Sequence, residues 1–88
     1  MTERSVTIRN RLGLHARAAA RFVQTATRYR SRIQVSRDNR SMDGKSILGI
    51  LLLCASQGTD LRITAEGDDE AEAVDALARL VESGFGEG

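Results

Sequence analysis

The chain has 88 residues, of which 41% are hydrophobic and 28% are charged, and its formal net charge is +1. This length supports one modest hydrophobic core, so residues 1–88 are predicted to form a single domain. Cys54 is the only cysteine, which excludes an intrachain disulfide and fits a reducing compartment. Because we find neither a signal-peptide core nor an apolar run long enough to span a bilayer, we expect a cytoplasmic protein without membrane insertion.

The first half of the chain predicts a strand, a helix and a hairpin. Apolar and polar residues alternate over residues 4–9, which is typical of a half-buried strand. Over residues 16–28 apolar residues recur at helical spacing, and Phe22 lies on the apolar face, where we expect it in the core. Residues 32–37 alternate again. The turn signal Asp38-Asn39 then leads to a short strand at residues 40–43.

The second half predicts a helix, a strand and a final helix. Residues 47–53 are apolar on every side, residues 60–66 alternate, and residues 69–83 carry an apolar stripe. Acidic residues crowd the first turns of the last helix, where carboxylates interact favourably with the helix dipole, so we interpret them as a helix start and expect no metal site. Strands with one apolar face and helices with one apolar stripe indicate an α+β fold, in which a mainly antiparallel sheet is covered on one side.

Charge is divided unevenly along the chain. Residues 1–45 carry eleven Lys or Arg against three Asp or Glu, whereas residues 46–88 carry two against nine. Such a division can mark a basic face for nucleic acid or for an acidic protein, or the two halves can interleave in space so that their fields partly cancel. Proteins that bind single-stranded nucleic acid stack bases on exposed rings, and this chain has three aromatic residues. We therefore expect no nucleic-acid partner.

The only histidine, His15, lies where the first strand pattern gives way to the first helix pattern. The first amides of a helix have no intrahelical partner and carry partial positive charge, so the backbone of Ala16 and Arg17 can bind a phosphoryl group attached to the ring. The Arg17 guanidinium can bind the same oxygens. The positive field also disfavours the imidazolium and favours a neutral, nucleophilic ring. The alternative is that His15 is only a polar loop residue whose ring caps the helix.

Three segments in register resemble HPr, the histidine phosphocarrier of the phosphoenolpyruvate-dependent phosphotransferase system. They are Asn10 with Leu12-Gly13-Leu14-His15-Ala16-Arg17, Lys45-Ser46-Ile47-Leu48-Gly49, and Gln57-Gly58-Thr59 with Ala65-Glu66-Gly67 and Asp69-Glu70. Together they cover nearly the whole chain. The resemblance implies an open-faced β-sandwich of order βαββαβα, with a four-stranded antiparallel sheet and three helices on one face.

The resemblance also implies a phosphoryl carrier and not a free-standing enzyme. His15 would accept a phosphoryl group on Nδ1 from enzyme I, which phosphoenolpyruvate phosphorylates, and pass it to an enzyme IIA-type acceptor. Arg17 would hold the phosphate oxygens, while Arg21, one turn further on, would meet acidic surfaces of the partners. No cofactor is implied, and we expect a monomer.

Ser46 has two interpretations. It stands at the N-cap position of the helix at residues 47–53, and a serine can fill that position for structural reasons alone. The resemblance implies a second role, regulatory phosphorylation by an HPr kinase/phosphorylase. Because one side of a two-layer fold cannot bury this whole helix, we expect part of it at the surface. The resemblance implies that this surface docks onto partners, with Ile47, Leu48 and Leu51 as the contacts by matching position, although each could instead serve the core.

Some residues depart from the family pattern or point to other functions. Ala18 stands where most HPr proteins have proline, and alanine should preserve the helix. Leu12 is apolar where some relatives carry a hydroxyl. The run from His15 to Ala20 and the ending Ser83–Glu87 resemble the nitrogen-related, NPr-like branch, so a regulatory interaction module without sugar transport is an alternative function. An acylphosphatase-like hydrolase is a further alternative, but its arginine-bearing glycine loop is missing.

Overall fold

Four strands and three helices follow one another in the order βαββαβα. The computed structural model describes residues 1–87. Its elements are β1 (Thr2–Thr7), α1 (Ala16–Ala26), β2 (Arg32–Arg37), β3 (Arg40–Asp43), α2 (Ile47–Leu52), β4 (Asp60–Glu66), α3 (Glu70–Glu82) and a 3-10 turn, η1 (Gly84–Gly86). The predicted α+β fold and element order are confirmed.

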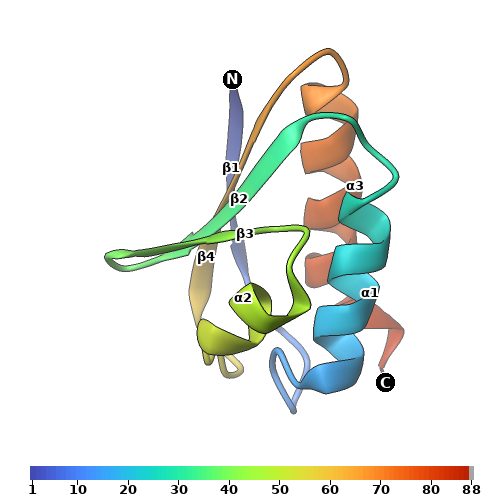
Figure 1. Cartoon of the computed structure of the whole chain (residues 1–88). Helices are drawn as coiled ribbons and strands as arrows, with labels where there is room; N and C mark the ends of the chain where they lie inside the picture. The colour runs from blue at the N-terminus through green and yellow to red at the C-terminus, as the bar shows by residue number, and fades with distance from the viewer. Residues whose placement is uncertain (88) are drawn as a thin grey trace.

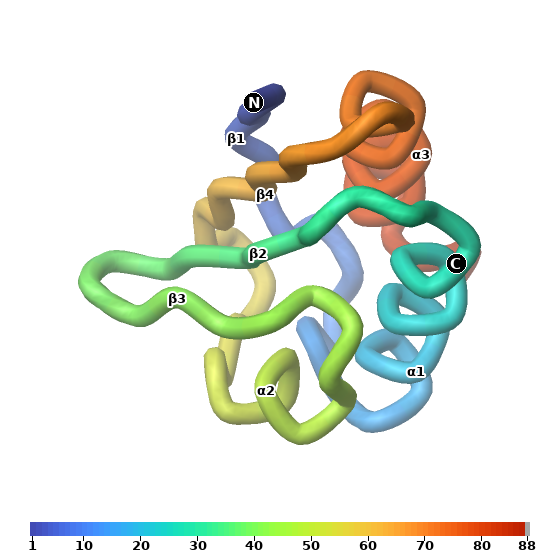
Figure 2. Tube along the Cα trace, turned by 45° about the horizontal axis from the view of Figure 1, so that its top comes forward, coloured from blue at the N-terminus to red at the C-terminus, as the bar shows by residue number. Residues whose placement is uncertain are grey.

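The strands form one antiparallel sheet in the order β1-β4-β2-β3. In the middle of the sheet Val35 of β2 lies opposite Ile63 of β4, and both are buried. The neighbouring residues Gln34 and Arg62 are exposed, as expected for a sheet with one apolar face. Figures 1 and 2 show α1 and α3 side by side on one side of the sheet, with the β2–β3 hairpin reaching away from them. The sheet is therefore covered on one face and open on the other.

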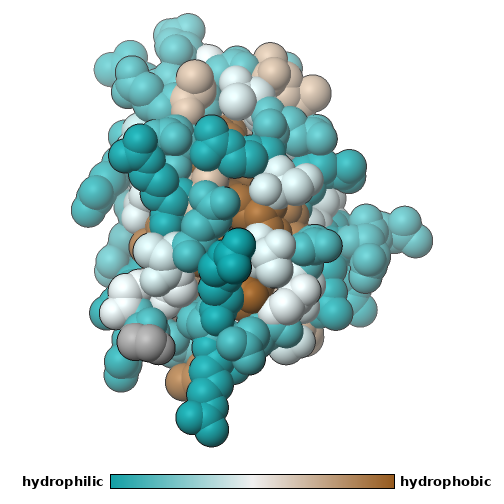
Figure 3. All heavy atoms as spheres, turned by 180° about the vertical axis from the view of Figure 1, so that it is seen from behind, coloured by the Kyte–Doolittle hydropathy of each residue, from teal (hydrophilic) through white to brown (hydrophobic). Residues whose placement is uncertain are grey.

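The core lies between the sheet and the helices. Phe22 of α1 is buried there, as its place on the apolar face predicts. Seen from behind in Figure 3, the molecule is mostly hydrophilic, and hydrophobic atoms show mainly between polar side chains. Within residues 1–87, no helix is both long enough and apolar enough to cross a membrane.

Several element ends differ from the sequence prediction because strand pairing and caps decide them. The first strand covers residues 2–7 and not residues 4–9, since Thr2 pairs with Ala65 of β4 at one end and Thr7 pairs with Asp60 at the other. The first helix ends at Ala26 instead of residue 28. α2 ends one residue earlier than predicted, at Leu52, and α3 is one residue shorter than predicted at each end.

The acidic residues at the start of α3 hold other segments in place. Asp69 accepts hydrogen bonds from the backbone amides of Arg30 and Ser31, at 2.8 and 3.0 Å, and from the Ser31 hydroxyl. The hydrogen bond from the Ser31 hydroxyl, followed by that from the Arg30 amide, lowers the pKa of Asp69. Asp69 thus ties the start of α3 to the turn between α1 and β2. In the part of the chain that the structure describes, no three His, Cys, Asp or Glu side chains gather as a metal site requires.

Glu70 ties the same helix to β1. Its carboxylate accepts a hydrogen bond from the Thr2 hydroxyl at 2.6 Å and lies 3.0 Å from the amino terminus. The hydrogen bond from Thr2 and then the amino terminus lower the pKa of Glu70 from 4.5 to about 2. The start of β1 and the start of α3 are therefore linked by a charged contact that depends on ionised Glu70.

We predict that Glu70→Gln destabilises the protein at pH 7 and that this difference fades in acid. A carboxyl whose pKa is lower in the folded state stabilises the fold above its unfolded pKa, and that stabilisation is lost as the pH falls toward the folded value. The gap between wild type and variant should therefore shrink from about pH 4.5 to about pH 2. Urea unfolding midpoints over this range measure it, with the exposed Glu72→Gln as control. A gap that does not change with pH would contradict the prediction.

Candidate functional site

A loop after β1 carries His15 to the start of α1. Gly13 adopts a left-handed conformation with φ of +66°, and its backbone packs so closely on Ala55 that an added Cβ would lie 2.5 Å from the Ala55 carbonyl oxygen. The next amide, that of Leu14, donates to the same oxygen at 2.9 Å. The Asn10 side chain donates to the Gly13 carbonyl at 2.7 Å. These contacts fix the backbone immediately before His15.

His15 occupies the N-cap position of α1 without capping it. Its backbone is extended, with φ of −74° and ψ of 177°, and its carbonyl accepts the Ala19 amide at 2.8 Å. Its side chain makes no cap hydrogen bond, and the first turn contains no acidic residue. The ring therefore does not cap the helix, and the functional role of His15 stays a prediction. The amides of Ala16 and Arg17 remain at the open end of the helix, where an anion is favoured.

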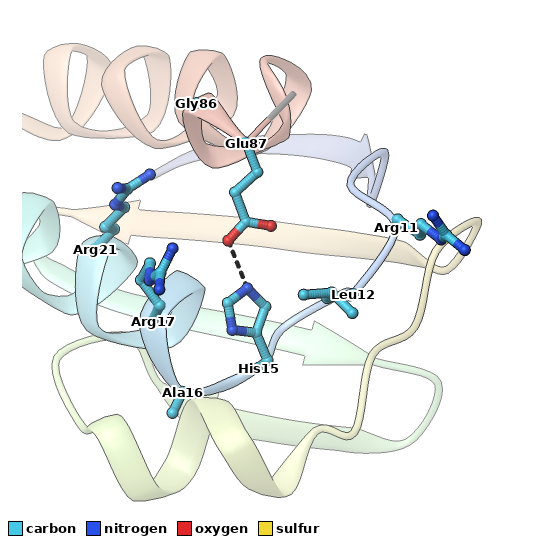
Figure 4. Close-up of a pocket in the computed structure, with 8 residues that line it drawn as sticks. All are labelled: Arg11, Leu12, His15, Ala16, Arg17, Arg21, Gly86 and Glu87. Carbon is cyan, nitrogen blue, oxygen red and sulfur yellow. Dashed lines mark hydrogen bonds and ion pairs between the residues drawn. The ribbon is translucent and has the colours of Figure 1, made fainter.

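An open hollow of about 870 Å³ surrounds the ring (Figure 4). It is lined by Arg11, Leu12, His15, Ala16, Arg17, Arg21, Gly86 and Glu87. The structure thus brings together the predicted nucleophile, both predicted backbone amides and both predicted arginines. Three arginines around one imidazole suit a ligand with several negatively charged oxygens.

Glu87 is a site residue that the sequence analysis missed. Its Oε2 lies 2.5 Å from His15 Nε2, and its Oε1 accepts a hydrogen bond from Asn10 at 3.0 Å. Burial by itself raises the pKa of the Glu87 carboxyl, but hydrogen bonds from Asn10 and His15, together with nearby positive charge, outweigh it and hold that pKa below its ordinary value. The sequence analysis considered only the positive field of the helix start at His15, whereas the structure also places a carboxylate in direct contact with the ring.

The two predicted arginines differ in their surroundings. Arg17 is exposed at the first turn of α1. Its charge makes a small further contribution to lowering the pKa of Glu87, after burial, which raises that pKa, and the hydrogen bonds, which lower it. Arg21 is also exposed, but its Nη1 donates to the backbone carbonyl of Phe85. Arg21 thus holds the C-terminal segment against α1. Its predicted contact with partners stays a prediction.

Ser46 is the N-cap of α2, as its sequence position predicts. Its Oγ accepts a hydrogen bond from the Gly49 amide at 3.0 Å. This bond satisfies one of the free amides at the start of the helix. The structural interpretation of Ser46 is confirmed, and its phosphorylation stays a prediction.

The outer side of α2 is an exposed apolar surface. Ile47 is 46% and Leu48 is 67% exposed, whereas Ile50 on the inner side is fully buried. Leu51 is only half-buried and packs against the core, while Leu52, which the sequence analysis did not select, is 49% exposed. The all-apolar pattern of this short helix could not show which side chains face inward. That depends on where the helix packs.

The chain resembles known phosphocarrier proteins along nearly its whole length. The family described as "PTS HPr component phosphorylation site" matches residues 2–83. "Phosphocarrier protein HPr" of Neisseria meningitidis serogroup A is 44% identical over 88 residues, which cover 100% of this chain and 99% of the relative.

Solved structures show the same similarity. The crystal structure of HPr-C-His from Thermoanaerobacter tengcongensis has a TM-score of 0.96 and 52% identity, covering 100% of this chain and 99% of that one. A crystal structure of an HPr dimer from the same organism has a TM-score of 0.79 and 53% identity, covering 99% of this chain and 100% of that one. The resemblance to HPr that three sequence segments suggested is confirmed, because solved HPr structures match this chain over 99–100% of its length.

We predict that Gly13→Ala destabilises the protein more than Gly58→Ala does. Both glycines have positive φ, but an added Cβ at Gly58 meets no atom within 4 Å, whereas at Gly13 it collides with the Ala55 backbone. The left-handed conformation alone should cost Gly58→Ala about 1 kcal/mol. The collision should cost Gly13→Ala roughly 1–3 kcal/mol more. Urea unfolding of both variants measures the difference, and equal losses would contradict the prediction.

Proposed function

The chain belongs to the HPr family of phosphocarrier proteins of the phosphotransferase system, and on that basis we propose that His15 carries the phosphoryl group. In this proposal His15 accepts the group from enzyme I and passes it to an enzyme IIA-type acceptor. The observation that supports it best is the position of the His15 ring, in an arginine-lined hollow at the open N-terminus of α1. The protein would then be a substrate of its partners.

The transfer itself needs one nucleophile and several anion-binding groups. The lone pair of His15 Nδ1 attacks phosphorus, the new N–P bond forms, and the bond from phosphorus to the donor breaks with its electron pair leaving on the donor. The amides of Ala16 and Arg17 and the Arg17 guanidinium would bind the phosphoryl oxygens. Such groups act by positioning and by stabilising charge, which is the main contribution of proteins to phosphoryl transfer.

Partner proteins would dock on the apolar surface of α2 and on the arginines around His15. Ile47, Leu48 and Leu52 supply exposed apolar area, which marks interaction sites when it is contiguous. We propose a cytoplasmic location, which the lone Cys54 supports. The expected monomer stays a prediction, because a related HPr is described as a dimer. Membership of the nitrogen-related branch also stays a prediction.

We predict that enzyme I and phosphoenolpyruvate add one phosphoryl group to wild type and none to His15→Ala. Intact mass spectrometry before and after acid treatment measures the gain, because a phosphohistidine is lost in acid whereas a phosphoserine survives. Arg17→Ala should retain the site but accept the group more slowly, by about tenfold for a lost interaction of about 1.4 kcal/mol. If His15→Ala gained the same acid-labile group, the proposal would be wrong. A regulatory module that only binds partners would show no gain in wild type.

We predict that Ser46→Asp accepts the phosphoryl group about tenfold more slowly than wild type, without unfolding. A negative charge at this helix start is locally favourable, but it lies next to the exposed apolar side chains of α2 that partners would cover. The rate of mass gain with enzyme I measures the effect, and circular dichroism checks the fold. Ser5→Asp, on an exposed residue of β1, is the control for added charge. Wild-type rates for Ser46→Asp would rule out this regulatory role.

A further inference from the structure

We propose that Glu87 is a positioning residue for His15. Its carboxylate accepts the hydrogen of Nε2, leaves the lone pair on Nδ1 for the phosphoryl group, and balances the positive charge that the ring gains on phosphorylation. This inference rests on the proposed function of His15. It assigns a role to the C-terminal segment, which in the sequence served only to indicate a branch of the HPr family.

The contact between the two side chains selects one tautomer of the neutral ring. Glu87 Oε2 lies 2.5 Å from His15 Nε2, and Figure 4 shows the other ring nitrogen on the edge turned away from Glu87. An ionised carboxylate only accepts hydrogen bonds, and a neutral imidazole carries one N–H. The hydrogen therefore lies on Nε2, and Nδ1 keeps its lone pair. A buried carboxylate orients histidine by the same logic in hydrolytic triads.

A buried asparagine holds the carboxylate at this position. Asn10 Nδ2 donates to Glu87 Oε1 at 3.0 Å, so the two oxygens of the carboxylate have different partners. Asn10 itself is 3% exposed and also donates to the Gly13 carbonyl at 2.7 Å. The group that orients Glu87 is thus the group that orders the loop before His15. Loop, ring and carboxylate form one connected hydrogen-bonded unit.

The turn after α3 is built to bring Glu87 to the ring. Gly84, Phe85 and Gly86 all have positive φ, at 70°, 59° and 74°. This conformation is unfavourable for phenylalanine, yet its side chain is 1% exposed and packs in the core. Arg21 of α1 donates to the Phe85 carbonyl. The segment is therefore anchored by an apolar side chain and by the helix that begins at the site.

The arrangement accounts for every proton and charge in the transfer. When Nδ1 forms its bond to phosphorus and the donor leaves with the electron pair of the broken bond, the ring becomes a phosphorylated imidazolium that keeps its Nε2 hydrogen. The Glu87 carboxylate then faces a positive ring. When the acceptor takes the phosphoryl group, the electron pair of the N–P bond returns to Nδ1, and the ring is neutral again. No proton has to move in either direction.

The negative charge of Glu87 is directed at the ring edge opposite the reacting nitrogen. Three arginines line the same hollow, so an incoming phosphoryl group still meets a net positive surface. Because hydrogen bonds keep the pKa of Glu87 below its ordinary value, the carboxylate is ionised near neutral pH. Glu87 can thus act on the ring without excluding the anion.

The experiment compares full-length wild type with Glu87→Gln, Glu87→Ala and the control Glu82→Gln, which changes an exposed carboxylate at the end of α3. The first measurement is the 15N chemical shifts of the His15 ring at a pH where the ring is neutral. We expect the Nε2–H tautomer in wild type and in the control. Glu87→Gln should retain it, because its amide oxygen can accept the same hydrogen, and Glu87→Ala should lose that preference.

The second measurement is the rate of phosphoryl gain from enzyme I. We expect Glu87→Ala to be roughly tenfold or more slower than wild type, because a hydrogen bond to a charged group is lost. Glu87→Gln should fall between the two, since it keeps the hydrogen bond and loses the charge. The control should match wild type.

Two outcomes would overturn the proposal. The first is a Glu87→Ala variant with the wild-type tautomer and the wild-type rate. The second is faster transfer in both Glu87 variants, which would show that the carboxylate blocks the site. The proposed function is tested separately, because it fails only if wild type itself gains no phosphoryl group on His15. The ring shifts would still decide the tautomer in that case.

Discussion

The open N-terminus of α1 is the constraint on which the site depends. A helix start has free amides that a protein normally satisfies with a side chain of its own. Ser46 does this for α2, but His15 does not do it for α1. The start of α2 is therefore closed by its own serine, whereas the start of α1 is available to an anion.

That opening is maintained by a closely packed and hydrogen-bonded backbone. Gly13 packs on the carbonyl of Ala55, so the loop before His15 is fixed from the segment that follows α2. Asn10 joins this loop to the turn after α3. The site therefore depends on three parts of the chain that are far apart in sequence. A preorganised arrangement of this kind costs no reorganisation when the phosphoryl group arrives.

The divided charge of the sequence has a structural meaning in the hollow. The basic first half supplies Arg11, Arg17 and Arg21, while the acidic second half supplies Glu87. The two halves thus interleave at the site instead of forming separate basic and acidic faces there. Glu70 makes a second such contact between distant parts of the chain, at the amino terminus. Charged side chains in this protein therefore link distant segments as well as forming a surface for partners.

Hydrophobic periodicity and helix-start signals are local, so they were enough to predict the element order, the one-sided sheet and the place of His15. The cap at Ser46 followed from the same local logic. Three features depend on packing between distant segments: Glu87 contacts the ring, Arg21 donates to the Phe85 carbonyl, and Leu52 is more exposed than Leu51. A glycine on each side of an aromatic residue near the C-terminus was the available signal for the turn that carries Glu87. Where that turn ends depends on packing between α3 and α1, and hydrophobic periodicity carries no information about such contacts.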